Sequence, residues 1–481
     1  MKVEETRAGY ALETTGKRDW PVMTIEEIAD VNPRVDKAVI PDDLPVSFVP
    51  MPAVGAADGS IRVEETRPAG EVKKGFTAFL EGDVLFAKIT PCMENGKMAV
   101  VPKLVNGYGF GSTEFHVLRP KSGMDAMYIY YYVSSQIFRG EAERYMTGAV
   151  GQKRVSTTYL KQSTIPVAPL DQQKRIVAEI EKQFSRLDEA VANLKRVKAS
   201  LKRYKAAVLK AAVEGRLVET EAERARREGR SYETGKQLLQ RILETRRSQW
   251  QGKGKYKDPT APDTTNLPEL PEGWVWASLD QACVKITDGT HHSPKNYPHG
   301  EYKYITSKNV REFRLALEDI TYVDKATHDE IYARCDVRKD DVLYVKDGVN
   351  TGLTAKNTLD EPFSLLSSVG VFRALPLVSP DYLVAYLNST IVRDRMLANI
   401  AGVAITRLTL NKLKVTAIAI PPITEQDRIV AEVDRRLSLL RETEAQVDAN
   451  LKRAERLRQS ILSRAFSGDL LSADVLRERV V

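Results

Sequence analysis

Two stretches of the chain, 164–218 and 416–471, carry apolar residues at intervals of three and four over most of their length. Polar and charged residues fill the positions between them, which is typical of an amphipathic helix with one apolar stripe. We predict two long helices that pair as an antiparallel coiled coil. The alternative is an ordinary helical hairpin within a core. The predicted contact positions are Ile180, Phe184, Leu187, Val191, Leu194, Leu201 and Val208 in the first stretch, and Val433, Leu437, Leu440, Val447, Leu451, Ala454 and Ile461 in the second.

The two helical stretches repeat one sequence without a gap, since Pro-Leu-Asp-Gln-Gln-Lys-Arg-Ile from Pro169 matches Pro-Ile-Thr-Glu-Gln-Asp-Arg-Ile from Pro422. In each copy an Asp or Thr follows the proline and is predicted to accept a hydrogen bond from a free N–H of the first turn. A glycine at the other end is predicted to take the left-handed conformation that ends a helix. The matched pairs are Asp171 with Thr424, Arg175 with Arg428, and Gly215 with Gly468.

Before each helical stretch lies a block of short apolar runs separated by Gly, Pro and Asn, which predicts a mixed α/β domain. In the first block we expect strands at 45–50, 83–87 and 115–118, and one amphipathic helix from Met124 to about Arg144. The tyrosines of this helix are expected in the core rather than as a platform for base stacking. They are Tyr128, Tyr131 and Tyr132.

The second block copies the first. Trp274 matches Trp20, the run Asp341–Lys346 matches Asp83–Lys88, and Gly402 matches Gly148. Two similar halves imply a pseudo-two-fold axis, and antiparallel helices would place one block at each end, as suits a duplex with two half-sites. The predicted fold is α+β, ordered as leader 1–19, block 20–163, helix 164–218, charged linker 219–270, block 271–415, helix 416–471 and tail 472–481.

Composition adds little to this picture. The formal net charge is +7, and its excess lies in 164–270, whereas both blocks are close to neutral. A DNA-binding function would therefore need basic residues gathered on one face of each block. The three cysteines lack the spacing of a disulfide or metal motif, and no apolar run is long enough for a signal peptide or a membrane span. The simplest expectation is a cytoplasmic protein.

Catalytic motifs are not found. Asn32-Pro33-Arg34 fails as the loop of an adenine methyltransferase, and Asn95-Gly-Lys97 lacks the glycine of a phosphate-binding loop. Glu71-Val-Lys73 fits a short nuclease pattern that is common by chance. His291 and His292 with Cys283 raise the alternative of a zinc site, but adjacent histidines on a Gly/Pro loop lack ligand spacing. We expect no metal and no catalytic residues in this chain.

The opening of each helix, the entry Leu270-Pro-Glu-Gly-Trp274 and the run Thr287-Asp-Gly-Thr-His-His-Ser-Pro294 resemble the specificity (S) subunit of Type I restriction–modification enzymes. The resemblance covers nearly all of the chain from Trp20 to Leu471; the long linker 219–270 departs from the simplest family pattern. It implies two target recognition domains and helical spacers that dock two adenine-N6 methyltransferase (M) subunits, with restriction (R) subunits added. S-adenosylmethionine, ATP and Mg²⁺ would be used by those partners, and none by this chain.

The DNA-contacting residues are expected on loops that carry cations and polar groups. The glycine-led loops before the last strand of each block could place an arginine on guanine or phosphate, and a solvated turn is the alternative. The lysines after the paired strands could equally protect strand edges. The candidates are Lys88, Gln152, Lys153, Arg154, Gly289-Thr290, His291, His292, Lys295, Lys308, Asn309, Lys346, Thr406 and Arg407.

Two rival functions stay open at this stage. A coiled-coil protein that bridges DNA without a methyltransferase would bind without regard to sequence and with steep salt dependence. A stand-alone nuclease would need a metal-binding carboxylate cluster, which the sequence does not show.

Overall fold

The computed structural model describes residues 20–149, 151–251, 254–398 and 408–471. The chain forms two compact units, one of 1–195 with 448–481 and the other of 196–447, and each is described by itself. Among the described residues, no helix is both long and apolar enough to cross a membrane.

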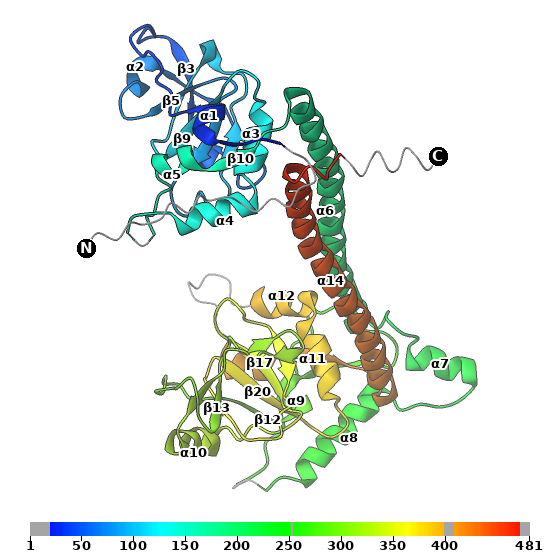
Figure 1. The fold of residues 1–481 in the computed structure, drawn as a ribbon. Coiled ribbons are helices and arrows are strands. Elements are labelled where there is room, and N and C mark those ends of the chain that lie inside the picture. Colours follow the sequence, from blue (N-terminus) through cyan, green and yellow to red (C-terminus); the bar gives the residue numbers. More distant parts are fainter. Residues whose placement is uncertain (1–19, 150, 252–253, 399–407, 472–481) are drawn as a thin grey trace. The chain divides into compact units, whose positions relative to one another are not determined.

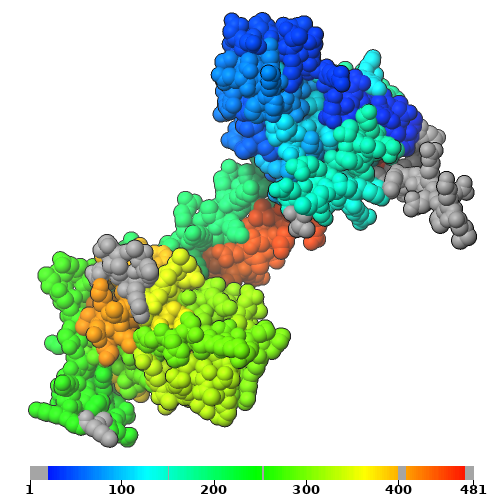
Figure 2. All heavy atoms as spheres, turned by 90° about the vertical axis from the view of Figure 1, so that its left-hand side faces the viewer, coloured from blue at the N-terminus to red at the C-terminus, as the bar shows by residue number. Residues whose placement is uncertain are grey.

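Ten strands lie among the described residues of the first block. They are β1 (Val22–Thr24), β2 (Ala29–Val31), β3 (Pro45–Val49), β4 (Glu65–Pro68), β5 (Thr77–Leu80), β6 (Val84–Ala87), β7 (Met98–Val100), β8 (Tyr108–Gly111), β9 (Phe115–Pro120) and β10 (Thr164–Pro166). They form sheets of order β2-β9-β6-β7 and β4-β3-β8-β5, and a ribbon β1-β10. The predicted strands at 45–50, 83–87 and 115–118 are confirmed by β3, β6 and β9. The block is the blue-to-cyan body of Figure 2.

Five short α-helices complete the first block: α1 (Ile25–Ile28), α2 (Ala69–Val72), α3 (Ala126–Val133), α4 (Gln136–Arg144) and α5 (Thr157–Gln162). The prediction of a single helix from Met124 to Arg144 is wrong, because the helix is interrupted between α3 and α4. The Ser135 side chain there accepts a hydrogen bond from the backbone N–H of Phe138 and begins a new helix. The tyrosines of α3 are buried, so their prediction as core residues is confirmed.

The second block has the strands β11 (Val275–Ser278), β12 (Cys283–Asp288), β13 (Tyr302–Ile305), β14 (Val310–Arg311), β15 (Arg314–Leu315), β16 (Thr321–Val323), β17 (Val342–Val345), β18 (Thr354–Lys356), β19 (Ser364–Leu365), β20 (Val369–Ala374) and β21 (Ala417–Ile420). Its helices are α9 (Leu279–Ala282), α10 (Lys325–Arg334), α11 (Pro380–Asn388), α12 (Thr390–Ala398) and α13 (Leu410–Lys414). The sheet β12-β20-β17-β18 repeats the strand order of β2-β9-β6-β7, and the ribbon β11-β21 repeats β1-β10. The predicted internal repeat is therefore a repeat of topology.

One buried ion pair recurs at the same place in both blocks. Arg119 on β9 donates two hydrogen bonds, each 2.8 Å, to the carboxylate of Asp83, which is 1% exposed. Arg373 on β20 holds the carboxylate of Asp341 in the same way, at 2.9 and 2.8 Å. A buried carboxylate needs such a partner, because its desolvation would otherwise be uncompensated. The repeated Asp-Val-Leu sequence thus marks the start of a core strand.

Two helices of 44 residues, α6 (Leu170–Val213) and α14 (Ile423–Phe466), follow the blocks. In the first unit Phe184, early in α6, lies under the guanidinium of Arg458, late in α14. In the second unit Leu201 of α6 joins a core with Leu437 and Leu440, early in α14. The helices therefore pair as an antiparallel coiled coil, as predicted (Figure 1).

In α6 the predicted contact stripe is buried most fully towards the ends of the helix. Leu187, Val191 and Leu194, in the middle of α6, and Leu451 of α14 are only partly buried, as a two-stranded contact allows. The remaining predicted positions of α14 are Val433, Leu437, Leu440, Val447 and Ala454, which are buried, and Ile461, which is partly buried. In α6, Ile180, Phe184 and Val208 are buried and Leu201 is partly buried.

The helices end as predicted but begin two residues earlier than the predicted caps allow. Gly215 and Gly468 have φ values of 64° and 82°, the left-handed conformation. Asp171 and Thr424 are not caps, because α6 and α14 already include Leu170 and Ile423. The preceding prolines suit this start, since the first helical N–H groups have no partner within the helix.

The glutamine of the repeated motif fastens each helix to its block. Gln173 is fully buried; its Oε1 accepts from the N–H of Asp125, 2.9 Å away, and its Nε2 donates to the carbonyl of Ala168, 2.7 Å away. Gln426, also fully buried, accepts from the N–H of Ser379 (2.9 Å) and donates to the carbonyl of Pro421 (3.1 Å). Asp125 and Ser379 are the N-caps of α3 and α11, so one side chain joins two helix starts.

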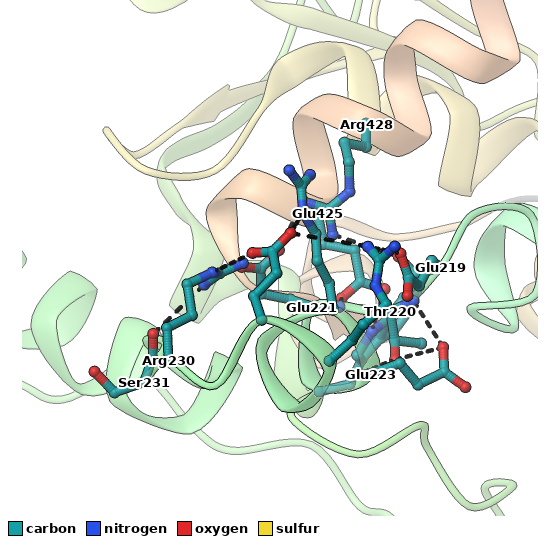
Figure 3. A network of polar contacts seen from close by, with 12 residues as sticks. Glu219, Thr220, Glu221, Glu223, Arg230, Ser231, Glu425 and Arg428 are labelled. Carbon is teal, nitrogen blue, oxygen red and sulfur yellow. Dashed lines mark hydrogen bonds and ion pairs between the residues drawn. The ribbon is translucent and has the colours of Figure 1, made fainter.

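The charged linker folds onto the second unit as α7 (Glu221–Glu228) and α8 (Gly235–Ser248). Glu221, 3% exposed, pairs with Arg230 (2.5 Å) and with Arg428 of α14 (2.6 Å). Its N–H donates to Glu425 (Figure 3). Glu425 also accepts from the indole N–H of Trp274. Burial raises the pKa of Glu425, whereas for Glu221 the effect of burial is outweighed by the two arginines, and its pKa is lowered. The linker is therefore anchored to the first turn of α14.

Candidate nucleic-acid interface

Lys88 and the loop before α5 lie side by side in the first block. Lys88 follows β6, and its carbonyl accepts from the N–H of Val155, 2.8 Å away. Ile89 and Arg154 form a bridge, and the carbonyl of Lys153 accepts from the N–H of Thr90 at 2.9 Å. The structure thus brings together three of the candidate cations: Lys88, Lys153 and Arg154. Gln152 and Lys153 are exposed at the tip of this loop.

Arg154 is held by a partner within the block. Its Nε and Nη2 donate to the carboxylate of Glu114 at 2.9 and 2.8 Å, and these hydrogen bonds lower the pKa of Glu114. Both prongs of the guanidinium are therefore occupied, and the expected two-pronged contact with guanine would require this ion pair to open. In this structure Arg154 orders the loop.

An open groove with a volume of about 360 Å³ lies beside Lys88. We call it the Lys88 groove; its charged lining residues are Arg34, Lys37 and Lys88, and among the described residues no Asp or Glu lines it. Lys37 donates to the carbonyls of Lys73 and Phe76, at 2.7 and 3.2 Å, whereas Arg34 is exposed. Sequence reasoning missed Arg34, because Asn32-Pro33-Arg34 was considered only as a failed methyltransferase motif.

The floor of the groove is a neutral histidine. His116, 3% exposed, lies 2.9 Å from the carbonyl of Val155 through Nε2 and 3.0 Å from the amide nitrogen of Asn32 through Nδ1. A proton on Nε2 satisfies both contacts, with Nδ1 accepting. Burial is the main cause that lowers the pKa of His116, and Lys88 adds to it. The ring therefore adds no charge to the groove at neutral pH.

The corresponding lysine of the second block is buried. Lys346, 2% exposed, has its Nζ 3.4 Å from Asp288 and 3.3 Å from Asp347. Asn309 is also buried, 1% exposed, and its amide is bonded to the N–H of Thr306 and the carbonyl of Ala316. Both side chains are thus used inside the block, and a DNA contact by Lys346 or Asn309 would require these contacts to open.

The loop after β12 carries the candidates Thr290, His291, His292 and Lys295 of the second block. Asp288, 1% exposed, lies 3.2 Å from Nε2 of His291 and accepts from Arg334 at 3.0 Å. The mostly buried Thr290 contacts His292 through its hydroxyl, 2.9 Å from Nδ1. Four candidates of this block are exposed: His291, His292 and Lys295 on this loop, and Lys308 after β13. Arg334 of α10 was not singled out from the sequence, since only the fold brings it to this loop.

Thr406 and Arg407 lie outside the described residues. Leu408, which follows them, donates its N–H to the carbonyl of Lys346 at 2.9 Å, as Val155 does to Lys88. The ends of the two loops are therefore attached to their blocks in the same way.

No group of His, Cys, Asp and Glu side chains in the part of the chain that the structure describes could hold a metal ion. Cys283, proposed as the third member of a zinc site, is buried in β12, and its thiol pKa is raised to about 12 by burial. A thiol of this kind is a poor metal ligand, because the ligand is the thiolate.

Comparison with known proteins agrees with this architecture. A family model described as the Type I restriction modification DNA specificity domain matches residues 17–203 and 271–453. The chain is 27% identical over 467 residues to the Type I restriction enzyme EcoAI specificity subunit of Escherichia coli, which covers 86% of this chain and 77% of that protein. It is also 27% identical over 472 residues to the Type I restriction enzyme EcoEI specificity subunit of the same species, and this match covers 86% of this chain and 77% of that protein.

One solved structure, from work on complex assembly and conformational transition of the type I R-M system, shares the fold. Its TM-score is 0.66 at 19% identity, covering 95% of this chain and 99% of that chain.

Proposed function

The chain belongs to the Type I restriction–modification specificity subunits, and from this premise we propose that it recognises an asymmetric DNA site in two parts. The observation that carries the proposal is the repeat: the two blocks share the strand order of one four-stranded sheet and of the terminal ribbon, but they bear different surfaces. Lys88 lines an open groove, whereas Lys346 is buried. Two such blocks would read two different half-sites, separated by bases that neither block contacts.

We propose further that the chain docks two adenine-N6 methyltransferase (M) subunits, to which restriction (R) subunits add. The exposed faces of α6 and α14 support this, since Arg175, Tyr204 and Leu439 point to solvent there. S-adenosylmethionine, ATP and Mg²⁺ would be bound by these partners and none by this chain. The chain itself would supply recognition without catalysis, acting in the cytoplasm where the host DNA lies.

The test is long-read detection of N6-methyladenine in the host genome with and without this gene. We expect one split motif, two short halves around a fixed run of any base, to lose methylation when the gene is deleted. If the partner genes are present and expressed and no motif changes, the chain is not the recognition subunit of an active methyltransferase. A coiled-coil protein that only bridges DNA would then be the better account.

Exchange of one block tests the two-part reading. Replacing residues 21–163 with the equivalent block of another specificity subunit should change one half of the methylated motif and leave the other half and the gap unchanged. A change in both halves would contradict the assignment of one half-site to each block.

A further inference from the structure

Lys88 and Lys346 occupy the same place in the two blocks. Each follows a central strand, β6 or β17. The carbonyl of Lys88 accepts from Val155 at 2.8 Å, and that of Lys346 accepts from Leu408 at 2.9 Å. The backbone therefore holds the two lysines at matching positions in their blocks.

The two lysines differ in the carboxylates around them. Asp288 and Asp347 lie within 3.4 Å of the Lys346 ammonium. Asp347 directly follows Lys346, and Ile89 follows Lys88. The residue that corresponds to Asp288 in the first block is found from the strand pairing. In the second block Ile286 pairs with Phe372, the residue before Arg373, and Asp288 lies two residues after Ile286. In the first block Val31 pairs with Leu118, the residue before Arg119, and Pro33 lies two residues after Val31. Pro33 therefore stands where the second block has Asp288.

The other charged groups near Lys88 do not neutralise it. The carboxylate of Glu114 is bonded to Arg154 through two nitrogens, and the ring of His116 is neutral. Arg34 and Lys37 add positive charge to the same lining. The Lys88 groove is thus an open, cationic depression, whereas the matching place in the second block is closed by an ion pair.

The polar groups of the groove suit an anion better than the edge of a base. The amide of Asn32 is committed at both ends, since Oδ1 accepts from the N–H of Val117 and Nδ2 faces His116, each at 3.0 Å. A lysine ammonium is a point charge that binds phosphate without reading sequence. The hydroxyls of Thr113 and Thr157 in the lining can add hydrogen bonds to phosphate oxygens.

We propose that the Lys88 groove holds a backbone phosphate of DNA, and that the second block has no matching phosphate contact at Lys346. This proposal rests on the proposed function. It makes the two blocks unequal in how they grip the duplex: the first uses a groove between its sheets, and the second must rely on other exposed cations. Lys88 would position the first block on the backbone without choosing the bases.

The test measures binding of the full chain, assembled with its methyltransferase subunits, to a fluorescent duplex carrying the methylated motif and to an unrelated duplex, over a series of salt concentrations. Lys88→Met should weaken binding to both duplexes several-fold, and the slope of log K against log salt should become shallower by about 0.9, the loss of one phosphate contact. Lys103→Met, at an exposed lysine outside the groove, should leave both quantities unchanged.

A second variant tests charge without removing the lysine. Ile89→Asp gives Lys88 the neighbour that Lys346 has, and it should reduce the salt slope as Lys88→Met does. Ile89→Asn introduces a side chain of the same shape as aspartate but without its charge, and its slope of log K against log salt should equal that of the wild type. Circular dichroism melting checks that all variants are folded.

Other outcomes overturn the proposal in distinguishable ways. Wild-type affinity and slope for Lys88→Met on both duplexes would remove Lys88 from the interface. Weakening confined to one base position of the motif would show base reading instead. Unchanged DNA binding, with loss of the stabilisation that inorganic phosphate gives the wild type, would assign the groove to free phosphate. If the wild type shows no preference for the motif, the proposed function fails, and the unrelated duplex still tests the groove.

Discussion

Some carboxylates of the second block each contact several cationic side chains. Asp336 accepts from Lys285 and Arg338 and lies 3.3 Å from Arg373. Burial would raise the pKa of Asp336, but the hydrogen bond from Lys285 and the charge of Arg373 outweigh it and lower the pKa to about 2. Such a group stabilises the fold only while it is ionised.

We predict that Asp336→Asn lowers the free energy of unfolding at neutral pH by roughly 1 kcal/mol, after allowance for solvent screening. Because the pKa is depressed in the folded state, the stabilisation is full above the pKa of an ordinary aspartate, about 4, and is lost as the pH falls towards 2. The difference between variant and wild type should therefore shrink over this range.

Tryptophan fluorescence during urea unfolding gives the measurement, since Trp250, Trp274 and Trp276 all lie in the second unit. Asp360→Asn, at a side chain 78% exposed, is the control and should have little effect at any pH. A constant difference between Asp336→Asn and wild type from neutral pH to pH 2 would contradict the ionic role.

Single residues also limit what the sequence could predict. Lys88 and Lys346 each close the same Asp-Val-Leu strand sequence, and both were reasonable candidates for DNA contact. Only the fold shows that Asp288, from another strand, reaches Lys346. Ionic partners that are distant in sequence cannot be read from a pattern, so the exposure of a charged side chain is harder to predict than that of an apolar one.

At the level of elements, the periodic apolar stripe predicted α6 and α14 closely, because a long stripe with a repeated opening leaves few alternatives. The break between α3 and α4 was missed, since the apolar positions continue across it and the start of α4 is marked only by the N-cap at Ser135. The caps at Asp171 and Thr424 were also predicted wrongly, because α6 and α14 already include Leu170 and Ile423. The buried glutamines Gln173 and Gln426 organise these starts instead.

We predict that Gln426→Ala lowers the free energy of unfolding by about 2 kcal/mol, because it leaves the partly buried N–H of Ser379 and the carbonyl of the buried Pro421 without this partner. The melting temperature of the second unit should fall by about 4–8 °C. Gln446→Ala, on an exposed face of α14, is the control and should change this melting temperature by less than the experimental error. Calorimetry of the intact chain makes the comparison, and equal melting for both variants would show that the glutamine does not fasten the helix.

At the level of the whole molecule, we propose that the paired helices set the distance between the half-sites. Inserting one helical turn into both α6 and α14 adds about 5.4 Å, against about 3.4 Å for each base pair. The unread gap of the methylated motif should lengthen by one or two base pairs while both halves stay the same. Methylome sequencing of a strain with the lengthened chain measures this. A gap of unchanged length would mean that the helices are not the ruler.

Each block begins and ends in one two-stranded ribbon, β1 with β10 and β11 with β21. The chain thus enters and leaves a block at neighbouring points, and the glutamine contacts beside the ribbon recur in both halves. For the gene, this means that recombination at the two ribbon sequences can transfer a whole block without disturbing the helices. A population holding a modest set of blocks could therefore assemble as many specificities as there are ordered pairs of blocks, with no new fold to evolve.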